Sequence, residues 1–370
     1  MPDRRAYKNT TEHRTDMTTT TATAIETDRP WEKPWPEDGL ETLGKCPVCG
    51  ETSRHILHDD LVDSAFFCAR GVWTLWQCAK CRSAYLDPRP TSDTIGQAYE
   101  QYYTHGTSIS KTEYNDLRGI HKIRRRLVNG YTKKRYGSPD EPASIFGFYL
   151  ANLIPFIKNT PDRYFRYIPL AENGSNKLLD IVCGDGEFLQ RAKSCGWDVC
   201  GVDPDPAAVA TAATKGLNVY QGNEESFSGH ENAFDVITLS HVIEHVHAPR
   251  KTLENCYKLL KPGGIFWIET PNYDSYGKQE FGKDWRGLDA PRHLTIFNRC
   301  SLHGALTQTG FKRVRDVARA SPTPWTYKAS WAMSLRMLAD SSLSVGWKIK
   351  CKAHAATLRG ILRPGRKEFL

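Results

Sequence analysis

Short apolar runs alternate with stretches of helical periodicity across the second half of the chain, from about residue 176 to residue 318. Short continuous apolar runs are typical of strands that are buried on both faces of a parallel sheet. They predict strands at residues 177–182, 197–202, 217–220, 234–240, 264–269 and 311–318. The intervening stretches predict helices at residues 185–195, 204–215, 248–260 and 299–309. The pattern therefore predicts an α/β fold, with a doubly wound, mostly parallel sheet that helices cover on both faces.

The remaining segments differ in composition from this α/β core. Residues 1–40 are rich in Thr, Pro and charged residues, which predicts disorder. Residues 44–90 contain two pairs of closely spaced cysteines and end at a stiff Asp-Pro-Arg-Pro connector. Residues 91–175 predict a helical connector or cap, and residues 319–370 predict a basic helical tail. The chain is thus expected to carry a small N-terminal module and a helical cap beside one α/β core at residues 176–318.

A glycine turn follows the first predicted strand of the core and opens the first predicted helix. Its glycines are Gly184 and Gly186, and an acidic residue, Asp203, stands just past the second predicted strand, about 20 residues later. The order strand, glycine turn, helix, strand and acid is the one by which a nucleoside-binding βαβ unit reaches ribose hydroxyls. The turn lacks a full G-x-G-x-x-G pattern, so a dinucleotide site is not predicted.

Several segments resemble motifs of the class I S-adenosylmethionine-dependent methyltransferases. Residues 178–189, with the sequence LLDIVCGDGEFL, resemble the first motif of that family. Residues 234–246 and 260–272 resemble its fourth strand with the following motif, and the turn and strand that come next. Pro291-Arg292-His293-Leu294 is similar to a landmark of a subgroup from bacterial glycan and secondary-metabolite clusters. The resemblance implies a Rossmann-like methyltransferase sheet, an enzyme of this class and S-adenosylmethionine as its cofactor.

The resemblance also implies which residues bind the cofactor. In this family the glycine loop runs under the methionine end of the cofactor, and the acid after the second strand holds its ribose. A polar side chain after the third strand is expected to reach the adenine. The implied cofactor-binding residues are Asp180, Gly184, Gly186, Asp203, Asn223, Glu224 and Ser240.

Val182 departs from the family pattern, because it stands where the loop has its first glycine. Valine is stiff and adds bulk at a point where backbone normally approaches the ligand closely. We expect Val182 to end the strand with its side chain turned into the core. The alternative is a weakened or lost cofactor site.

The cysteine-bearing module contains two C-x-x-C pairs, formed by Cys46 with Cys49 and by Cys78 with Cys81. Two such pairs can supply four thiolates to one tetrahedral Zn²⁺, which is the closed ligand set of a structural site. A redox pair is the alternative, and it is disfavoured because no thioredoxin-like βαβ pattern surrounds the cysteines. Similar zinc-ribbon-like modules precede many methyltransferases of the subgroup that the chain resembles.

Two histidines are candidates for a catalytic base. Methyl transfer to a hydroxyl benefits from a base near its proton, and histidine serves best near neutral pH. His241 follows the fourth predicted strand, and His293 lies in the loop after the fifth, which usually covers the acceptor in this family. For both, a structural role with satisfied hydrogen bonds is the alternative. A metal site formed by His241, Glu244, His245 and His247 is a further alternative.

Positive charge is concentrated in two segments of this 370-residue chain, whose formal net charge is +8. Residues 111–136 hold nine Lys or Arg against two acids, and residues 347–370 hold seven against one. Such segments suit a phosphate-bearing partner: a nucleotide-linked substrate, a nucleic acid or an anionic lipid. Solvated helix faces are the alternative. Residues 328–370 could lie as an amphipathic helix on an anionic membrane, or pack on the core instead.

The absence of an apolar run of 18 or more residues predicts no transmembrane helix. The start of the chain carries no apolar signal-peptide region, so we expect a cytoplasmic location with reduced cysteines. Peripheral contact with the inner face of the membrane, through the basic tail, would be compatible with that location. The sequence predicts no particular oligomeric state.

The combined prediction is an S-adenosylmethionine-dependent methyltransferase that acts on a hydroxyl of a small or glycan-type acceptor, such as a nucleotide- or lipid-linked sugar. The first rival is an RNA methyltransferase that uses the zinc module to bind nucleic acid. Against it, the position after the fourth strand lacks the Asn/Asp-Pro-Pro-aromatic pattern of enzymes that methylate base amino groups. The second rival is a degenerate, non-catalytic binding protein, which Val182 would indicate and the remaining glycines and acids argue against.

Overall fold

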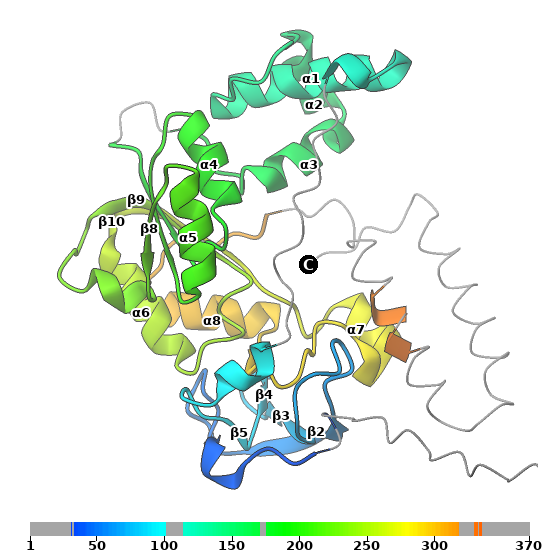
Figure 1. The fold of residues 1–370 in the computed structure, drawn as a ribbon, viewed down its shortest axis with the longest axis vertical. Helices are drawn as coiled ribbons and strands as arrows, with labels where there is room; N and C mark the ends of the chain where they lie inside the picture. The colour runs from blue at the N-terminus through cyan, green and yellow to red at the C-terminus, as the bar shows by residue number, and fades with distance from the viewer. Residues whose placement is uncertain are drawn as a thin grey trace, which may run out of the picture.

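The computed structural model describes residues 31, 33–100, 114–170, 175–317, 329–331 and 333–334. Within these ranges a helical cap, a parallel sheet with its covering helices, and a small β-module follow one another from the top to the bottom of Figure 1. Short 3-10 helices lie at Glu37–Gly39, Ile95–Tyr99, Tyr114–Asp116, Glu224–Phe227 and Gly282–Asp284. No helix in the described ranges combines the length and apolarity that a bilayer crossing requires.

The central sheet has five parallel strands in the order β10-β9-β6-β7-β8. Their bounds are β6 Lys177–Ile181, β7 Asp198–Asp203, β8 Asn218–Gln221, β9 Phe234–Ser240 and β10 Leu260–Glu269. Each lies within a few residues of a predicted strand, because the buried apolar runs that fill the centre of the sheet are continuous in the sequence. The parallel α/β fold predicted from the sequence is therefore confirmed.

Helices cover both faces of the sheet (Figure 1). They are α4 Glu187–Ser194, α5 Pro206–Thr214, α6 Pro249–Leu259 and α8 Arg299–Thr309. Successive residues of β6 point to opposite faces: Leu178 packs in the same cluster as α4 and α5, whereas Leu179 packs with α6 and α8. This two-sided packing is the doubly wound arrangement that the alternating pattern predicted.

The predicted strand at 311–318 is wrong for residues 311–317, which form no strand. The segment is mostly charged, and Arg313 has a φ of +56°, which breaks an extended path. Asp316 turns back to α8, where its carboxylate pairs with Arg299 and lies 2.9 Å from Nε2 of His303. In the described residues β10 is consequently an edge strand of the sheet.

The helical cap consists of α1 Gly119–Tyr136, α2 Phe146–Leu153 and α3 Pro155–Tyr164. Its buried centre is Asp162, which accepts hydrogen bonds from the hydroxyls of Tyr131 and Tyr136 at 2.5 and 2.6 Å. The side chains of Tyr136 and Phe165 stack with their centroids 4.6 Å apart. Helical structure in the connector was predicted from the sequence, whereas the tyrosine–aspartate centre was not.

The N-terminal module is an antiparallel sheet that a distant part of the chain completes. Its strands β2 Arg54–Leu61, β3 Trp73–Cys78 and β4 Ala84–Leu86 are joined by β11 Thr295–Ile296, in the order β11-β4-β3-β2. A smaller pair connects β1 Leu40–Glu41 with β5 Arg89–Pro90. The segment after β10, with helix α7 Tyr276–Phe281, therefore lies against the module (Figure 1).

The prediction of disorder for residues 1–40 is wrong for residues 33–40; residues 1–30 and 32 lie outside the described ranges. Trp35 is buried, and its ring packs edge-on against Trp73 of β3 at 5.5 Å between centroids. Its indole N–H donates to the carbonyl of Gly39 at 3.2 Å. The backbone carbonyls of Lys33 and Gly39 also accept the N–H groups of Gly71 and Thr91, at 2.8 and 2.9 Å. A composition dominated by polar residues does not reveal these anchors.

Arg292, in the segment between α7 and β11, joins the module to the core. Its side chain is fully buried. The guanidinium donates to both carboxylate oxygens of Asp63, between β2 and β3, and to Oδ1 of Asp289 at 3.0 and 3.2 Å. A further bond runs from Nη1 to the carbonyl of Ala98 at 2.9 Å. Burial opposes the charge of Arg292, yet the two carboxylates outweigh this and raise its pKa. We call Arg292, Asp63 and Asp289 the arginine clamp.

Replacing Arg292 by methionine should destabilise the fold strongly, because it leaves the buried carboxylate of Asp63 without its cation and Asp289 with Arg286 alone. We expect the free energy of unfolding to fall by about 3–5 kcal/mol, the cost of breaking a buried ion pair by removing one partner. Urea unfolding monitored by tryptophan fluorescence measures this loss.

The matched control is Arg299→Met. Arg299 also pairs with an aspartate, but 59% of its side chain is exposed, and such pairs contribute only about 0–1 kcal/mol. Equal losses of unfolding free energy in the two variants would contradict a special role for the arginine clamp.

Candidate active site

The glycine loop after β6 leaves open space at the carboxyl edge of the sheet. Gly184 and Gly186 have φ values of +57° and +77°, a region that favours glycine. A Cβ on Gly186 would lie 2.4 Å from Cδ1 of Leu217, so this glycine is required for packing. A Cβ on Gly184 would meet nothing within 4 Å, so the space above that residue is available to a ligand.

Asp203, the last residue of β7, fixes this loop. Its Oδ2 accepts the backbone N–H of Gly184 at 2.7 Å, and its Oδ1 accepts that of Asp205 at 2.9 Å. Its side chain is buried, and burial raises the pKa of its carboxyl. Each carboxylate oxygen has a second lone pair, so Asp203 can hold the loop and still accept a hydroxyl from a ligand.

The expectation that Val182 turns into the core is wrong. Its side chain is 37% exposed, and its φ is +55°, in the left-handed region. A β-branched residue is strained there by roughly 1–3 kcal/mol. The glycine loop needs this turn immediately after β6, and the turn carries the valine side chain out of the sheet toward solvent.

Arg166, two residues beyond the end of α3, is a site residue that sequence reasoning missed. Its Nη1 donates to Oδ1 of Asp180 and, at 2.7 Å, to Oγ1 of Thr238. Its guanidinium lies 3.7 Å from the ring centroid of Phe188. The other oxygen of Asp180, Oδ2, is buried and has no hydrogen-bond partner among the described residues. The only sequence signal was the need of a buried aspartate for a cation.

The residues predicted near the adenine have mixed surroundings. Oδ1 of Asn223 accepts the backbone N–H of Glu225 at 2.9 Å and so caps a short 3-10 helix. Glu224 is buried and lies 3.5 Å from Nδ2 of Asn255 on α6. Ser240 ends β9 and pairs in register with Glu269 of β10. Cofactor binding by these residues stays a prediction.

His241, directly after β9, is half-exposed at the same edge of the sheet. Its φ is +56°, and its backbone N–H donates to the carbonyl of Glu269 at 2.8 Å. Its Nδ1 lies 3.3 Å from Oε1 of Glu244, a fully buried carboxylate. Burial raises the pKa of such a group, but the hydrogen bond with His241 and the nearby imidazoles outweigh burial and lower the pKa of Glu244 to about 2. An ionised partner therefore orients the His241 ring.

His293 also lies close to Glu244, with ligand atoms of the two residues within 4.8 Å of each other, but it is buried. Its Nδ1 lies 2.8 Å from the carbonyl of Gly287, which makes Nδ1–H the donor. Burial, followed by the neighbouring His245, lowers the pKa of His293 to about 4. The rings of His293 and His245 meet edge-on at 4.7 Å. The structure thus brings both candidate bases to Glu244, one facing solvent and one enclosed.

The predicted alternative metal set is only partly brought together. Ligand atoms of Glu244, His245 and His293 lie within 4.8 Å of one another. His247 instead directs Nε2 to the carbonyl of Pro90 at 3.0 Å. Nδ1 of His245 lies 3.0 Å from both the carbonyl of Arg292 and the hydroxyl of Tyr99, which accounts for this nitrogen without a metal.

A family model described as a methyltransferase domain matches residues 153–315. The chain is 33% identical over 184 residues to a ubiquinone biosynthesis O-methyltransferase of Cereibacter sphaeroides, covering 46% of this chain and 71% of that protein. The chain belongs to the class I S-adenosylmethionine-dependent methyltransferases. Proteins of the same description from Cronobacter sakazakii and Caulobacter vibrioides are 37% and 38% identical, each over 26% of this chain. The chain spans 42% and 40% of their respective lengths.

Solved methyltransferase structures have a partial likeness to this one. A protein from Thermotoga maritima superposes with a TM-score of 0.36 at 20% identity, covering 46% of this chain and 78% of that structure. One from Archaeoglobus fulgidus has a TM-score of 0.35 at 20% identity, covering 52% and 92%. The residues that the family model matches, 153–315, include the glycine loop and both candidate bases. They do not include the cysteine module.

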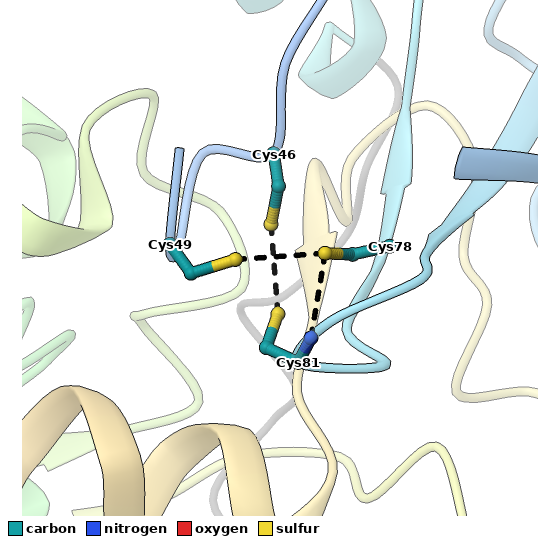
Figure 2. Close-up of side chains that lie close together, drawn as sticks. All are labelled: Cys46, Cys49, Cys78 and Cys81. Carbon is teal, nitrogen blue, oxygen red and sulfur yellow. Dashed lines mark hydrogen bonds between the residues drawn. The ribbon is translucent and has the colours of Figure 1, made fainter. Parts of the chain in front are cut away.

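The four cysteines of the methyltransferase's N-terminal module converge on one point (Figure 2). Sγ of Cys46 lies 3.6 Å from Sγ of Cys81, and Sγ of Cys49 lies 3.5 Å from Sγ of Cys78. Four thiolates at about 2.3 Å from a tetrahedral zinc stand about 3.8 Å apart, so the set fits this ion closely.

The two cysteine pairs are built alike. The backbone N–H of Gly50 donates to the carbonyl of Cys46 at 2.9 Å, and that of Arg82 donates to the carbonyl of Cys78 at 3.1 Å. Gly50 and Arg82 both have a positive φ, of +76° and +62°. Each pair is therefore one tight turn that presents two sulfurs to the same side.

Proposed function

We propose that this protein transfers a methyl group from S-adenosylmethionine to a hydroxyl of a small acceptor. The observation that carries the proposal is the open glycine loop, whose Gly184 N–H is bound by the carboxylate of Asp203. Nearby, Oδ2 of Asp180 is buried and has no hydrogen-bond partner among the described residues. Gly184 leaves room where a cofactor would approach. The family match and the O-methyltransferases among the relatives support the same reaction.

The cofactor, when bound, supplies a methyl group that is already activated as a sulfonium. The chain's own residues then bind and align. Asp203 is suited to accept a ribose hydroxyl, and Arg166 offers a cation to a carboxylate beside Asp180. Alignment of acceptor and methyl can supply a large part of the rate.

His241 is the better of the two candidate bases. Glu244 is ionised at neutral pH and accepts from Nδ1–H, which places the lone pair on Nε2, the atom that takes the hydroxyl proton. His293 has a pKa of about 4, which makes it a weak base, and it is enclosed by its own loop. In this assignment His293 is a positioning residue. Its ring packs against that of His245, and both lie close to Glu244.

The relatives that support a hydroxyl acceptor are described as ubiquinone biosynthesis O-methyltransferases. The chain spans less than half the length of two of them. A small acceptor is the form of the proposal that they favour. The finer prediction of a glycan-type acceptor, linked to a nucleotide or a lipid, draws its support from the basic segments. A cytoplasmic location likewise stays a prediction.

We also propose that Cys46, Cys49, Cys78 and Cys81 hold a structural zinc. The tetrahedral arrangement of their sulfurs supports it, and so does the position of the cluster. Nδ2 of Asn298, which caps α8, donates to the carbonyl of Cys81 at 3.2 Å, so the ion would stabilise the contact between module and core.

The cofactor assignment predicts that Asp203→Ala weakens binding of S-adenosylmethionine, because it removes an acceptor for the ribose and the support of Gly184. We expect a loss of about 1.5–3 kcal/mol in binding free energy by calorimetry. Asp198→Ala is the matched control, since Asp198 is an exposed aspartate at the other end of the same strand. Absence of binding heat in the unaltered protein would overturn the enzyme assignment and favour the degenerate binding protein.

The base assignment predicts that His241→Asn lowers kcat about 100-fold or more while cofactor affinity stays nearly unchanged. His293→Asn should lower the melting temperature and change kcat far less than His241→Asn does, because His293 is buried and bonded to its own loop. The assay offers small hydroxyl-bearing molecules, sugar nucleotides and RNA as separate methyl acceptors. Methylation of RNA alone would replace the small-acceptor proposal, and equal kcat in all proteins would leave alignment as the sole source of rate.

The zinc assignment predicts one zinc ion per chain by elemental analysis. Cys78→Ser should release it and lower the melting temperature, because metal binding to such a module is folding free energy. Cys300→Ser, at an exposed cysteine outside the cluster, should change neither quantity. A protein free of zinc and unaffected by Cys78→Ser would contradict the assignment.

A further inference from the structure

Helices α1 and α2 of the cap present large apolar side chains to solvent. Of the sixteen large apolar side chains that are exposed in the described residues, eight fall between residues 120 and 164. Leu153, with 79% of its surface exposed, is the most extreme. Exposed apolar side chains that gather in one part of a fold are candidates for a binding surface. We call the following set the cap face: Ile120, Ile123, Ile145, Phe146, Tyr149, Leu153 and Ile154.

The packing of α2 against α1 fixes the direction of these side chains. A Cβ on Gly147 would lie 1.9 Å from the carbonyl oxygen of Leu127 on α1, so the helices touch through backbone. Ala151, one turn later, is also buried. Tyr149 and Leu153 lie on the opposite side of α2, because the helical repeat places them about half a turn away. The helix cannot rotate to bury them without losing the close contact at Gly147.

Cations accompany the cap face. Residues 117–139 contain eight Lys or Arg and no acid. Lys133, Lys134 and Arg135 occupy the exposed last turn of α1, and Arg126 is exposed near its middle. One acid from outside this window, Glu141, pairs with Lys133 on the surface. The cap thus combines apolar side chains with a strongly positive surrounding.

We propose that the cap face docks on the surface of a bilayer that contains anionic phospholipids. The apolar side chains of α2 would enter the interfacial region, and the cations of α1 would lie near the phosphate headgroups. RNA would engage the cations but leave Phe146 and Leu153 in water. A second copy of the chain would bring two strongly positive surfaces together. The anionic bilayer satisfies both the apolar and the basic part of the surface.

This docking surface is distinct from the basic tail at 328–370, most of which lies outside the described residues. It also stands independently of the proposed reaction. The cap face and the candidate site are connected in the chain, since α3 begins two residues after Leu153 and ends two residues before Arg166, which binds Asp180 of β6. Docking through the cap would therefore hold the site close to acceptors that reside in or on the bilayer.

The test is co-sedimentation of the full chain with vesicles of phosphatidylcholine alone or mixed with phosphatidylglycerol. We expect binding only to the mixed vesicles, weakened by high salt. The double variant Phe146→Ser/Leu153→Ser should lower the partition coefficient at least tenfold, because each side chain loses its burial in the interface. Lys134→Gln/Arg135→Gln should lower it about fivefold or more while leaving any residual binding to neutral vesicles unchanged.

The matched control is Val72→Ser/Ile265→Ser, which removes two exposed apolar side chains outside the cap and should leave binding unchanged. Melting temperatures of all variants verify that they fold. Recovery of the unaltered chain in the supernatant with anionic vesicles would overturn the proposal. So would equal binding of the Phe146/Leu153 variant, which would move the membrane contact elsewhere, for example to the tail. Self-association that this variant abolishes would identify the cap face as an interface between copies and would also overturn it.

Discussion

The arginine clamp is the constraint on which the shape of the site depends. Asp63 and Arg292 are separated by 229 positions, yet both side chains of the contact are fully buried. Once Asp63 and Asp289 are out of solvent, the guanidinium between them cannot leave without taking the only cation from Asp63 and one of two from Asp289. The segment that carries Arg292 is therefore tied to the N-terminal module, and β11 extends that module's sheet from the same tie.

The positions of the histidines follow from this tie. The carbonyl of Arg292 lies 3.0 Å from Nδ1 of His245, and the next residue is His293. The backbone N–H groups of Leu294 and Thr295 both donate to the carbonyl of Glu244, at 2.7 and 3.1 Å. The backbone of Glu244, which orients His241, is thereby fixed by the segment that the clamp holds, while Thr270 donates to its carboxylate at 2.8 Å. The N-terminal module is therefore connected to the segment that fixes the backbone of Glu244, through the arginine clamp and through β11.

The sequence revealed the parts of the protein that local patterns determine. The bounds of β9 and α8 agree with those predicted, because an uninterrupted apolar run and a capped helical repeat each specify an element alone. Each cysteine pair is equally local, since one tight turn presents its two sulfurs to the same side, although the fold brings the two pairs together. The arginine clamp and the Arg166–Asp180 pair could not be found this way, because a charged residue in the sequence does not disclose a partner that only the tertiary fold supplies. The strand predicted at 311–318 failed for a related reason: Asp316 pairs with Arg299 of α8, and residues 311–317 do not continue the sheet.

Val182 and His241 show how local rules give way at the site itself. Both stand directly after a central strand, and both hold a left-handed conformation, at φ values of +55° and +56°. Such a conformation persists in residues other than glycine only where the surroundings determine it. At His241 the surrounding contacts are two hydrogen bonds: the carbonyl of Glu269 accepts its backbone N–H, and the carboxylate of Glu244 binds its ring. For Val182 the neighbouring N–H groups of Cys183 and Gly184 are bound by Val202 and Asp203. The same type of turn directs the glycine loop and the imidazole of His241 toward one edge of the sheet, where the proposed cofactor and base would lie side by side.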